Sequence, residues 1–234
     1  LRREVAVWHR LDHPNIVPLL GITYDFGSHI SMVSPWLENG TLNDYLRSRE
    51  PQPENLGRLL IDIVDGLAYL HSHDVIHGDL HPANVLIGDN GRAQVTDFGL
   101  SLIIPEFEGT SFMTTSVIRG ALRWVAPEIF SIRPSGDTSL SVSEMSDVYS
   151  FGGIVYQVLC GEMPFADVRN DMQVIVSVKD GQRPKRHRAI STTNWVFLQW
   201  CWNSRPEDRP SLVQIREFLQ TKLDEPLKGQ LHPM

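Results

Sequence analysis

Cysteine is scarce in this sequence, which has only two, Cys160 and Cys201, among its 234 residues. Two cysteines cannot build the disulfide framework of a small secreted domain, and their spacing is not that of a zinc site. Each lies in an apolar, helix-like stretch, so we expect buried thiols. The sequence therefore favours a reducing compartment, and we expect the protein to be cytoplasmic.

A long apolar run is also missing. The longest apolar stretch, from Val148 to Cys160, is interrupted by polar residues and glycines and is too short to span a bilayer. The charged first four residues do not resemble a secretory signal. Positive charge is not in excess, because 21 Lys and Arg stand against 28 Asp and Glu, for a net charge of −7. We therefore expect no membrane insertion and no nucleic-acid partner.

The local sequence pattern changes near residue 37. Before that point, Val5, Trp8 and Leu11 recur at helical spacing, and two strand-like runs follow at 16–23 and 29–34. After that point the chain is mostly helical. Its long amphipathic stretches are 55–72, 146–160 and 194–202, and its short β runs are 85–87 and 93–95. The pattern predicts an α+β fold in which a small β-containing part joins a larger helical part.

Polar motifs that could carry chemistry follow one another in the middle of the chain. They are His77-Gly78-Asp79-Leu80-His81-Pro82-Ala83-Asn84, Thr96-Asp97-Phe98-Gly99 and Ala126-Pro127-Glu128. Asp79, Asn84 and Asp97 are short oxygen-bearing residues in two loops, and a hairpin between the neighbouring β runs would bring both loops together. Such oxygens suit Mg²⁺, and phosphoryl transfer needs metal ions and a carboxylate near the attacking hydroxyl. Any one loop alone would be read as an ordinary turn, but all of them in this order favour phosphoryl transfer.

With these motifs the chain resembles the eukaryotic protein kinases, from Leu1 to about Leu223. The runs 123–128, 146–152 and Cys201-Trp202 are similar to the tyrosine-kinase-like (TKL) group. The resemblance implies a bilobal kinase-like fold with a mostly helical C-lobe and an incomplete, β-containing N-lobe. It divides the chain into an N-lobe remnant with the hinge (1–37), the C-lobe (38–223) and a C-terminal tail (224–234).

The resemblance also implies roles for individual residues. Asp79 matches the catalytic base, His81 and Asn84 stand beside it in the catalytic loop, and Asn84 and Asp97 match the Mg²⁺ ligands. The residues that match the ATP site are Glu4 on the regulatory helix, Ser34 as gatekeeper, Pro35 to Leu37 at the adenine edge, Leu86 beneath the ring, and Asp97. The residues that match structural supports are Trp8, Leu19, His77 and Phe98 in the apolar spine, Asp147 as its anchor, and the ion pair of Glu128 with Arg209.

The implied activity is transfer of the γ-phosphate of ATP, with Mg²⁺, to Ser or Thr hydroxyls of protein substrates, with Tyr left open. Regulatory protein partners are compatible with this activity. An alternative is a catalytically impaired pseudokinase that acts as an interaction module. Another is a small-molecule phosphotransferase, against which the Ala-Pro-Glu motif and the long segment from Asp97 to Glu128 argue, because they would form a platform for protein substrates.

The sequence departs from the family pattern in several places. Neither a glycine-rich loop nor the strand lysine precedes Glu4, so we expect the missing strands upstream and little activity from this chain alone. Gly78 replaces the arginine that usually pairs with a phosphorylated activation loop. His81 replaces a lysine, and Gly120-Ala121 stand where Ser/Thr kinases carry a threonine. The last two changes remove partners of Asp79 and would leave it less firmly oriented.

Overall fold

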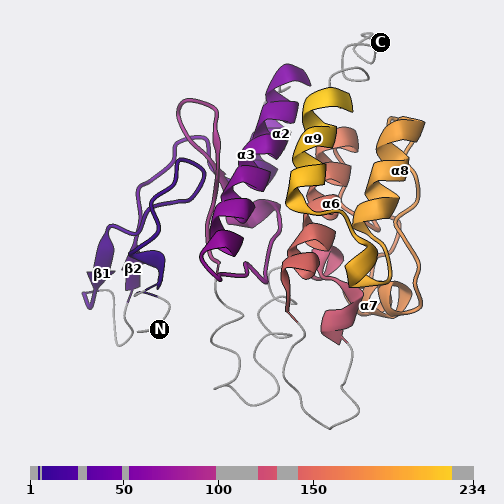
Figure 1. Cartoon of the computed structure of the whole chain (residues 1–234), viewed down its shortest axis with the longest axis horizontal. Helices are drawn as coiled ribbons and strands as arrows, with labels where there is room; N and C mark the ends of the chain where they lie inside the picture. The colour runs from indigo at the N-terminus through magenta and orange to yellow at the C-terminus, as the bar shows by residue number, and fades with distance from the viewer. Residues whose placement is uncertain are drawn as a thin grey trace, which may run out of the picture.

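The computed structural model describes residue 5 and residues 7–25, 31–48, 53–98, 121–130 and 142–222. Glu4, the segment 99–120 and the predicted tail 224–234 lie outside the described residues. The strands are β1 (Gly21–Thr23), β2 (Ser31–Val33), β3 (Val85–Ile87) and β4 (Ala93–Val95). The α-helices are α2 (Leu42–Ser48), α3 (Pro53–Ser72), α6 (Glu144–Cys160), α7 (Asp171–Lys179), α8 (Thr192–Cys201) and α9 (Leu212–Lys222) (Figure 1). Short 3₁₀ turns form at Pro82–Asn84 (η1), Ala121–Trp124 (η3), Pro127–Phe130 (η4) and Pro206–Asp208 (η5).

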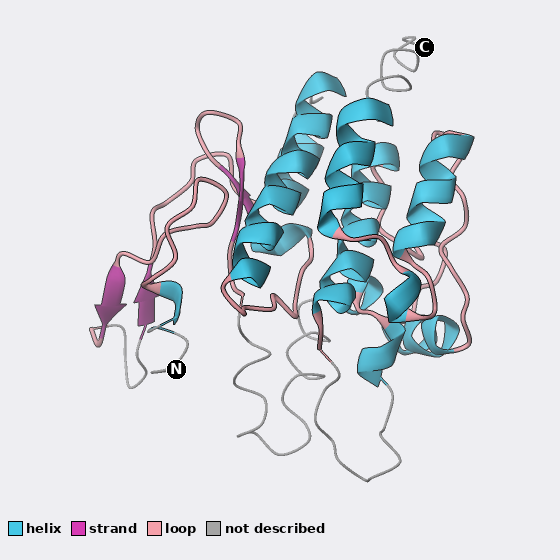
Figure 2. Cartoon of the chain, viewed as in Figure 1, coloured by secondary structure: helices cyan, strands magenta, loops and turns pink. Residues whose placement is uncertain are grey.

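The strands form two separate antiparallel hairpins, β1 with β2 and β3 with β4. The β1–β2 hairpin lies at the left edge of the molecule, away from α3, α6, α8 and α9, whereas β3 and β4 lie beside α3 (Figure 2). The β3–β4 hairpin matches the predicted runs, with Val85 opposite Val95. The mixture of helices and small sheets agrees with the expected α+β class.

The predicted strand at 16–23 is wrong over most of its length, because only Gly21–Thr23 forms a strand. Pro18 has no backbone N–H to give to a ladder. Ile16 and Val17 pair instead with β4: Ile16 bridges Val95, and the Val17 N–H donates to the Val95 carbonyl at 3.0 Å. This stretch therefore joins the N-terminal part of the chain to the second hairpin.

The helical part is built around α3 and α6. Helix α3 packs on α9, β4 and α6, and its apolar face is fully buried. Helix α6 begins at a capping box between Ser143 and Ser146 and ends at Gly161, whose φ of 76° suits glycine. The predicted helices at 55–72, 146–160 and 194–202 are confirmed as α3, α6 and α8, with ends within two residues of the prediction. None of the described helices is both long and apolar enough to cross a membrane.

Two ion pairs, each with one fully buried partner, hold loops against this helical part. Arg209 donates two hydrogen bonds to the Glu128 carboxylate, at 2.6 and 2.8 Å, which confirms the expected ion pair. It also donates to the Met145 carbonyl. The fully buried carboxylate of Asp62 on α3 accepts from Arg92 and from the backbone N–H of Ala93. The second pair holds β4 against α3 and was not predicted.

Candidate active site

The β3–β4 hairpin brings two of the predicted loops together. Asn84 directly precedes β3 and Thr96 directly follows β4, and the Thr96 N–H donates to the Asn84 carbonyl at 3.0 Å. The loop that holds Asp79 and Asn84 therefore lies next to the loop that holds Asp97. The expectation that a hairpin would place these loops side by side is confirmed.

The backbone of the predicted catalytic loop, residues 77–84, is fixed by a carboxylate from α6. Asp147, almost fully buried, accepts hydrogen bonds from the backbone N–H groups of His77 and Gly78, each at 2.9 Å. The same carboxylate lies 2.8 Å from Nε2 of His71 at the end of α3. Gly78 has a φ of 76°, a conformation that a side chain would strain. Glycine suits this backbone conformation. It also lacks the side chain of the arginine that the family usually has here.

Asp79 lies in this loop with its carboxylate buried. Its backbone N–H donates to Nδ1 of His77 at 3.2 Å, and its carbonyl accepts from Nδ2 of Asn84 at 2.8 Å. Nε2 of His81 is 3.8 Å from Oδ2 of Asp79, too far for a hydrogen bond. The other carboxylate oxygen, Oδ1, has no partner among the described residues. Asp79 thus offers an oxygen that could accept a proton, which is what a general base needs.

The residues expected to hold Mg²⁺ have suitable donor atoms. Asn84 is almost fully buried and uses Nδ2 for Asp79, so its oxygen is the atom left to face a ligand. Asp97 stands just after β4 with a φ of 56°, in the left-handed region that is uncommon for residues other than glycine. Such backbone strain occurs often at functional sites. A carboxylate and an amide oxygen are hard ligands of the kind Mg²⁺ takes, so these residues fit the ion.

His77 lies behind the catalytic loop in a stack of rings. Phe98 contacts Trp8 edge to face at 5.3 Å between centroids and lies 6.5 Å from His77. Burial lowers the pKa of His77, against the opposing effect of Asp147 and Asp79. The neutral ring suits its role, since Nδ1 must accept the hydrogen bond from the backbone of Asp79. Three of the residues expected in the apolar stack, Trp8, His77 and Phe98, thus lie together. Leu19 is also buried in the core.

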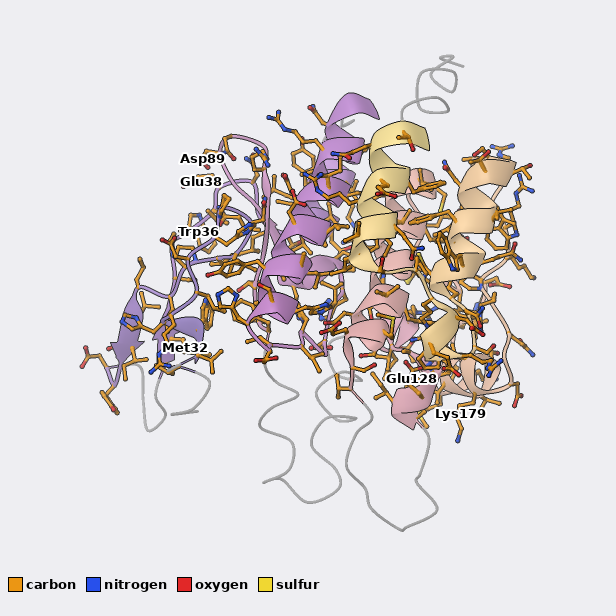
Figure 3. The ribbon with its side chains drawn as sticks, in the orientation of Figure 1. Met32, Trp36, Glu38, Asp89, Glu128 and Lys179 are labelled. Atoms are coloured by element: carbon orange, nitrogen blue, oxygen red, sulfur yellow. The ribbon has the colours of Figure 1, made fainter. Side chains whose placement is uncertain are left out.

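The segment expected at the adenine edge leads from β2 toward α2, as the labels on Met32, Trp36 and Glu38 show (Figure 3). Ser34 is exposed, whereas Pro35 and Leu37 are half-buried. The segment is tied to β3 farther on, where the Ile87 N–H donates to the Gly40 carbonyl and Thr41 bridges Leu86. Leu37 and Leu86 both pack against the hydrophobic core.

Several residues near this site were missed by the sequence reasoning. His71 holds Asp147 from the end of α3, and nothing in its local sequence pointed to that role. Trp124 and Gln157 lie close to the catalytic loop; Trp124 stacks at an angle on His81, with 6.3 Å between the ring centroids. Trp124 belongs to the run 123–128, which resembles the kinase family. That resemblance could have pointed to Trp124, whereas the pattern of polar and apolar residues could not.

The chain is similar in sequence to known proteins over nearly its whole length. Residues 1–219 match the family of protein tyrosine and serine/threonine kinases. The chain is 30% identical over 227 residues to mouse Ephrin type-A receptor 1, covering 96% of this chain and 22% of that protein. It is 28% identical over 249 residues to human Receptor-interacting serine/threonine-protein kinase 1, with coverage of 96% and 35%. It is 30% identical over 233 residues to Serine/threonine/tyrosine-protein kinase HT1 of Arabidopsis thaliana, with coverage of 98% and 56%.

The chain thus spans less than two thirds of the length of each of these relatives, although they cover nearly all of it. One of these relatives is named for serine/threonine and another for serine/threonine/tyrosine, so their names do not decide the phosphate acceptor. The family match covers most of the chain, and the loops that hold Asp79 and Asp97 meet at the β3–β4 hairpin. The chain belongs to the protein kinase family.

Proposed function

We propose that this protein transfers the γ-phosphate of ATP to Ser or Thr hydroxyls of protein substrates, and that it belongs to the TKL group. The observation that carries the proposal is the buried carboxylate of Asp79, which has one oxygen without a partner among the described residues and lies beside Asn84 and Asp97. In a loop with only a structural role, a buried carboxylate oxygen is expected to have a hydrogen-bond partner.

In this proposal Asp79 accepts the proton of the substrate hydroxyl, and His81 lies beside it. The oxygens of Asn84 and Asp97 hold Mg²⁺, which would neutralise charge on the phosphates of ATP. Pro35, Leu37 and Leu86 line the adenine site, with Ser34 as gatekeeper and Glu4 as a further nucleotide-site residue. The N-lobe remnant would end near residue 37 and the C-lobe near residue 223. We place the protein in the cytoplasm, with protein substrates and regulatory proteins as partners.

The metal assignment can be tested in the full-length protein by replacing Asp97 with Ala. We expect Mg²⁺-dependent ATP affinity and peptide phosphorylation both to be lost, because a hard ligand and its charge are removed. Asp89→Ala serves as the control, since that aspartate is exposed in the turn between β3 and β4. Unchanged metal-dependent nucleotide affinity in Asp97→Ala would refute the assignment.

A catalytically impaired pseudokinase remains the second candidate. It is favoured by the 3.8 Å separation of His81 from Asp79, which leaves the carboxylate without the cationic partner usual in Ser/Thr kinases. Peptide phosphorylation by the full-length protein separates the two proposals. Turnover that disappears in Asp79→Asn supports the enzyme, whereas ATP binding without such turnover supports the pseudokinase.

A further inference from the structure

A cavity of about 410 Å³ lies beside the catalytic loop. Residues from α2, the catalytic loop, η3, α6 and the segment before α7 line it, among them Arg47, His81, Trp124, Gln157 and Arg169. Its wall thus includes His81, which is 3.8 Å from the proposed catalytic base. A group in this cavity would lie within a few residues of a hydroxyl at Asp79, since an extended peptide advances about 3.3 Å per residue.

Three residues of this wall each have a buried polar atom with no hydrogen-bond partner among the described residues: Nε2 of His81, Nε1 of Trp124 and Oε1 of Gln157. The three side chains belong to residues that are 3%, 6% and 8% exposed. Buried polar atoms are almost always paired in folded proteins, because an unpaired one loses its hydrogen bonds to water and gains none from the protein. A cluster of them around one cavity indicates a place where a polar ligand completes the hydrogen bonding.

The wall offers mainly donors. Nδ1 of His81 accepts from the backbone N–H of Ala83, so the neutral ring carries its hydrogen on Nε2. The indole N–H of Trp124 can only donate. Gln157 donates to Oδ1 of Asn43 at 2.8 Å, and its own unpaired atom, Oε1, is an acceptor. A ligand that pairs with the two donors, His81 and Trp124, must supply acceptor atoms.

Positive charge surrounds the same cavity. Arg47 and Arg169 are exposed at its edge, and neither forms an ion pair within the described part of the chain. The acid in the lining, Asp171, is already bound by Arg123 at 2.7 Å. Asp44, three residues before Arg47 and outside the lining, is exposed and attracts Arg47, so it offsets part of that charge. The residues that line the cavity still carry a net positive charge, which suits an anion.

We propose that this cavity binds an acidic side chain of the peptide substrate, a few residues from the phosphate acceptor. The proposal rests on the proposed function, because it assumes a peptide at Asp79. A carboxylate or a phosphorylated side chain would accept from His81 and Trp124 and would be attracted by Arg47 and Arg169. The site therefore selects substrates with an anionic residue near the hydroxyl.

The test is peptide binding to the whole chain without nucleotide, so that it does not depend on phosphoryl transfer. The probes are serine-containing peptides in which a glutamate is moved one position at a time along both sides of the serine, each compared with its glutamine counterpart. NMR titration follows the indole N–H signal of Trp124, assigned with Trp124→Phe. At one position we expect glutamate to bind about tenfold more tightly than glutamine and to shift this signal.

The variant that tests the charge is Arg47→Ala combined with Arg169→Ala, which we expect to abolish the preference for glutamate. The matched control replaces two other exposed cations, Arg188→Ala with Arg205→Ala, and should keep it. Phosphoserine in place of the glutamate distinguishes the source of the anion: tighter binding identifies a phosphorylated side chain, and equal or weaker binding identifies a carboxylate.

Equal binding of glutamate and glutamine peptides at every position would overturn the proposal. So would a preference that survives the loss of Arg47 and Arg169, or one that leaves the Trp124 signal unmoved. If the preference is found and the full-length protein still fails to phosphorylate the preferred peptide, the cavity assignment stands and the proposed activity falls.

Discussion

At the scale of single residues, the carboxylate of Asp147 determines the path of the catalytic loop. It receives the N–H groups of His77 and Gly78 in succession, and the second of these residues has a positive φ. An unpaired, buried N–H is costly, so the loop keeps this shape only while the carboxylate is present. The position of Asp79 therefore depends on a residue in another element.

We predict that Asp147→Ala lowers the free energy of unfolding by about 2 kcal/mol or more, because two buried N–H groups lose their acceptor. Urea unfolding followed by circular dichroism measures the change. Asp89→Ala, on an exposed turn, is the control and should alter stability by less than about 0.5 kcal/mol. A similar small change in both variants would show that the loop does not need this carboxylate.

The sequence was informative about residues in short motifs and less so about their distant partners. Asp79, Asn84 and Asp97 could be expected to meet because a hairpin between nearby β runs joins their loops. His71 and Gln157 could not be found in this way. Their roles depend on contacts with Asp147 and Asn43, which are 76 and 114 positions away along the chain.

At the scale of elements, tryptophan side chains pack directly on helix α6 at Gly152 and Gly153. A methyl group added at Gly153 would lie 2.5 Å from Cδ1 of Trp124, and one at Gly152 would lie 2.8 Å from Nε1 of Trp202. These glycines interrupt the apolar run 148–160 because neighbouring tryptophans pack directly on the helix backbone. Glycine lowers helix propensity, but here it permits the packing.

Gly153→Ala should consequently destabilise the protein by about 1–3 kcal/mol, although the same change in an open helix would stabilise it. The midpoint of chemical unfolding is the measurement. Gly21→Ala provides the comparison, since nothing lies within 4 Å of the added methyl group there. An increase in stability for Gly153→Ala would mean that Trp124 moves aside freely.

A second prediction for α6 concerns alkaline pH. Burial raises the pKa of Tyr149 to about 12, against the opposing effect of Arg183 and Arg209. An unfolded tyrosine ionises near pH 10, so the stabilising contribution is complete below about pH 10 and is lost as the pH rises toward 12. The wild-type chain should lose on the order of 2 kcal/mol more than Tyr149→Phe across this range. Tyr24→Phe, which changes an exposed tyrosine, should titrate like the wild type.

Helices and strands could be predicted where apolar residues recur with a single clear spacing. Helices α3 and α6 follow from their amphipathic or apolar patterns, and β3 and β4 from short runs between turns. The run 16–23 looked equally strand-like. Its first residues pair with Val95, a contact that becomes evident only once the second hairpin has been placed in space.

At the scale of the whole molecule, the β1–β2 hairpin lies apart from the helical part, at the left of Figure 1. Leu20, Ile22, Tyr24 and Val33 on or beside it are exposed apolar residues. A two-stranded hairpin with exposed apolar side chains has few contacts to stabilise it. Its stability should therefore be lower than that of the helices.

Amide hydrogen exchange should show this difference. The Leu20 N–H bonds to the Val33 carbonyl, and we expect at least about tenfold less protection for it than for the Ile154 amide in α6. The Val17 amide is a control from the same segment, because it bonds to Val95 in the second hairpin and should exchange slowly. Equal protection at Leu20 and Ile154 would show that the hairpin unfolds only with the whole molecule.

The hydrogen bonds of Asp147 also restrict the length of the segment between His71 and His77. His71 and His77 contact the same carboxylate oxygen, so the segment 72–76 is closed into a loop whose two ends meet at one atom. An inserted or deleted residue in this segment would pull one histidine away from that atom. The turn between β3 and β4 is held differently, because its two ends bond to two separate side chains, Asn39 and Asp62. During evolution, changes of length should therefore accumulate in turns like the latter, while the spacing from His71 to Asp79 stays constant.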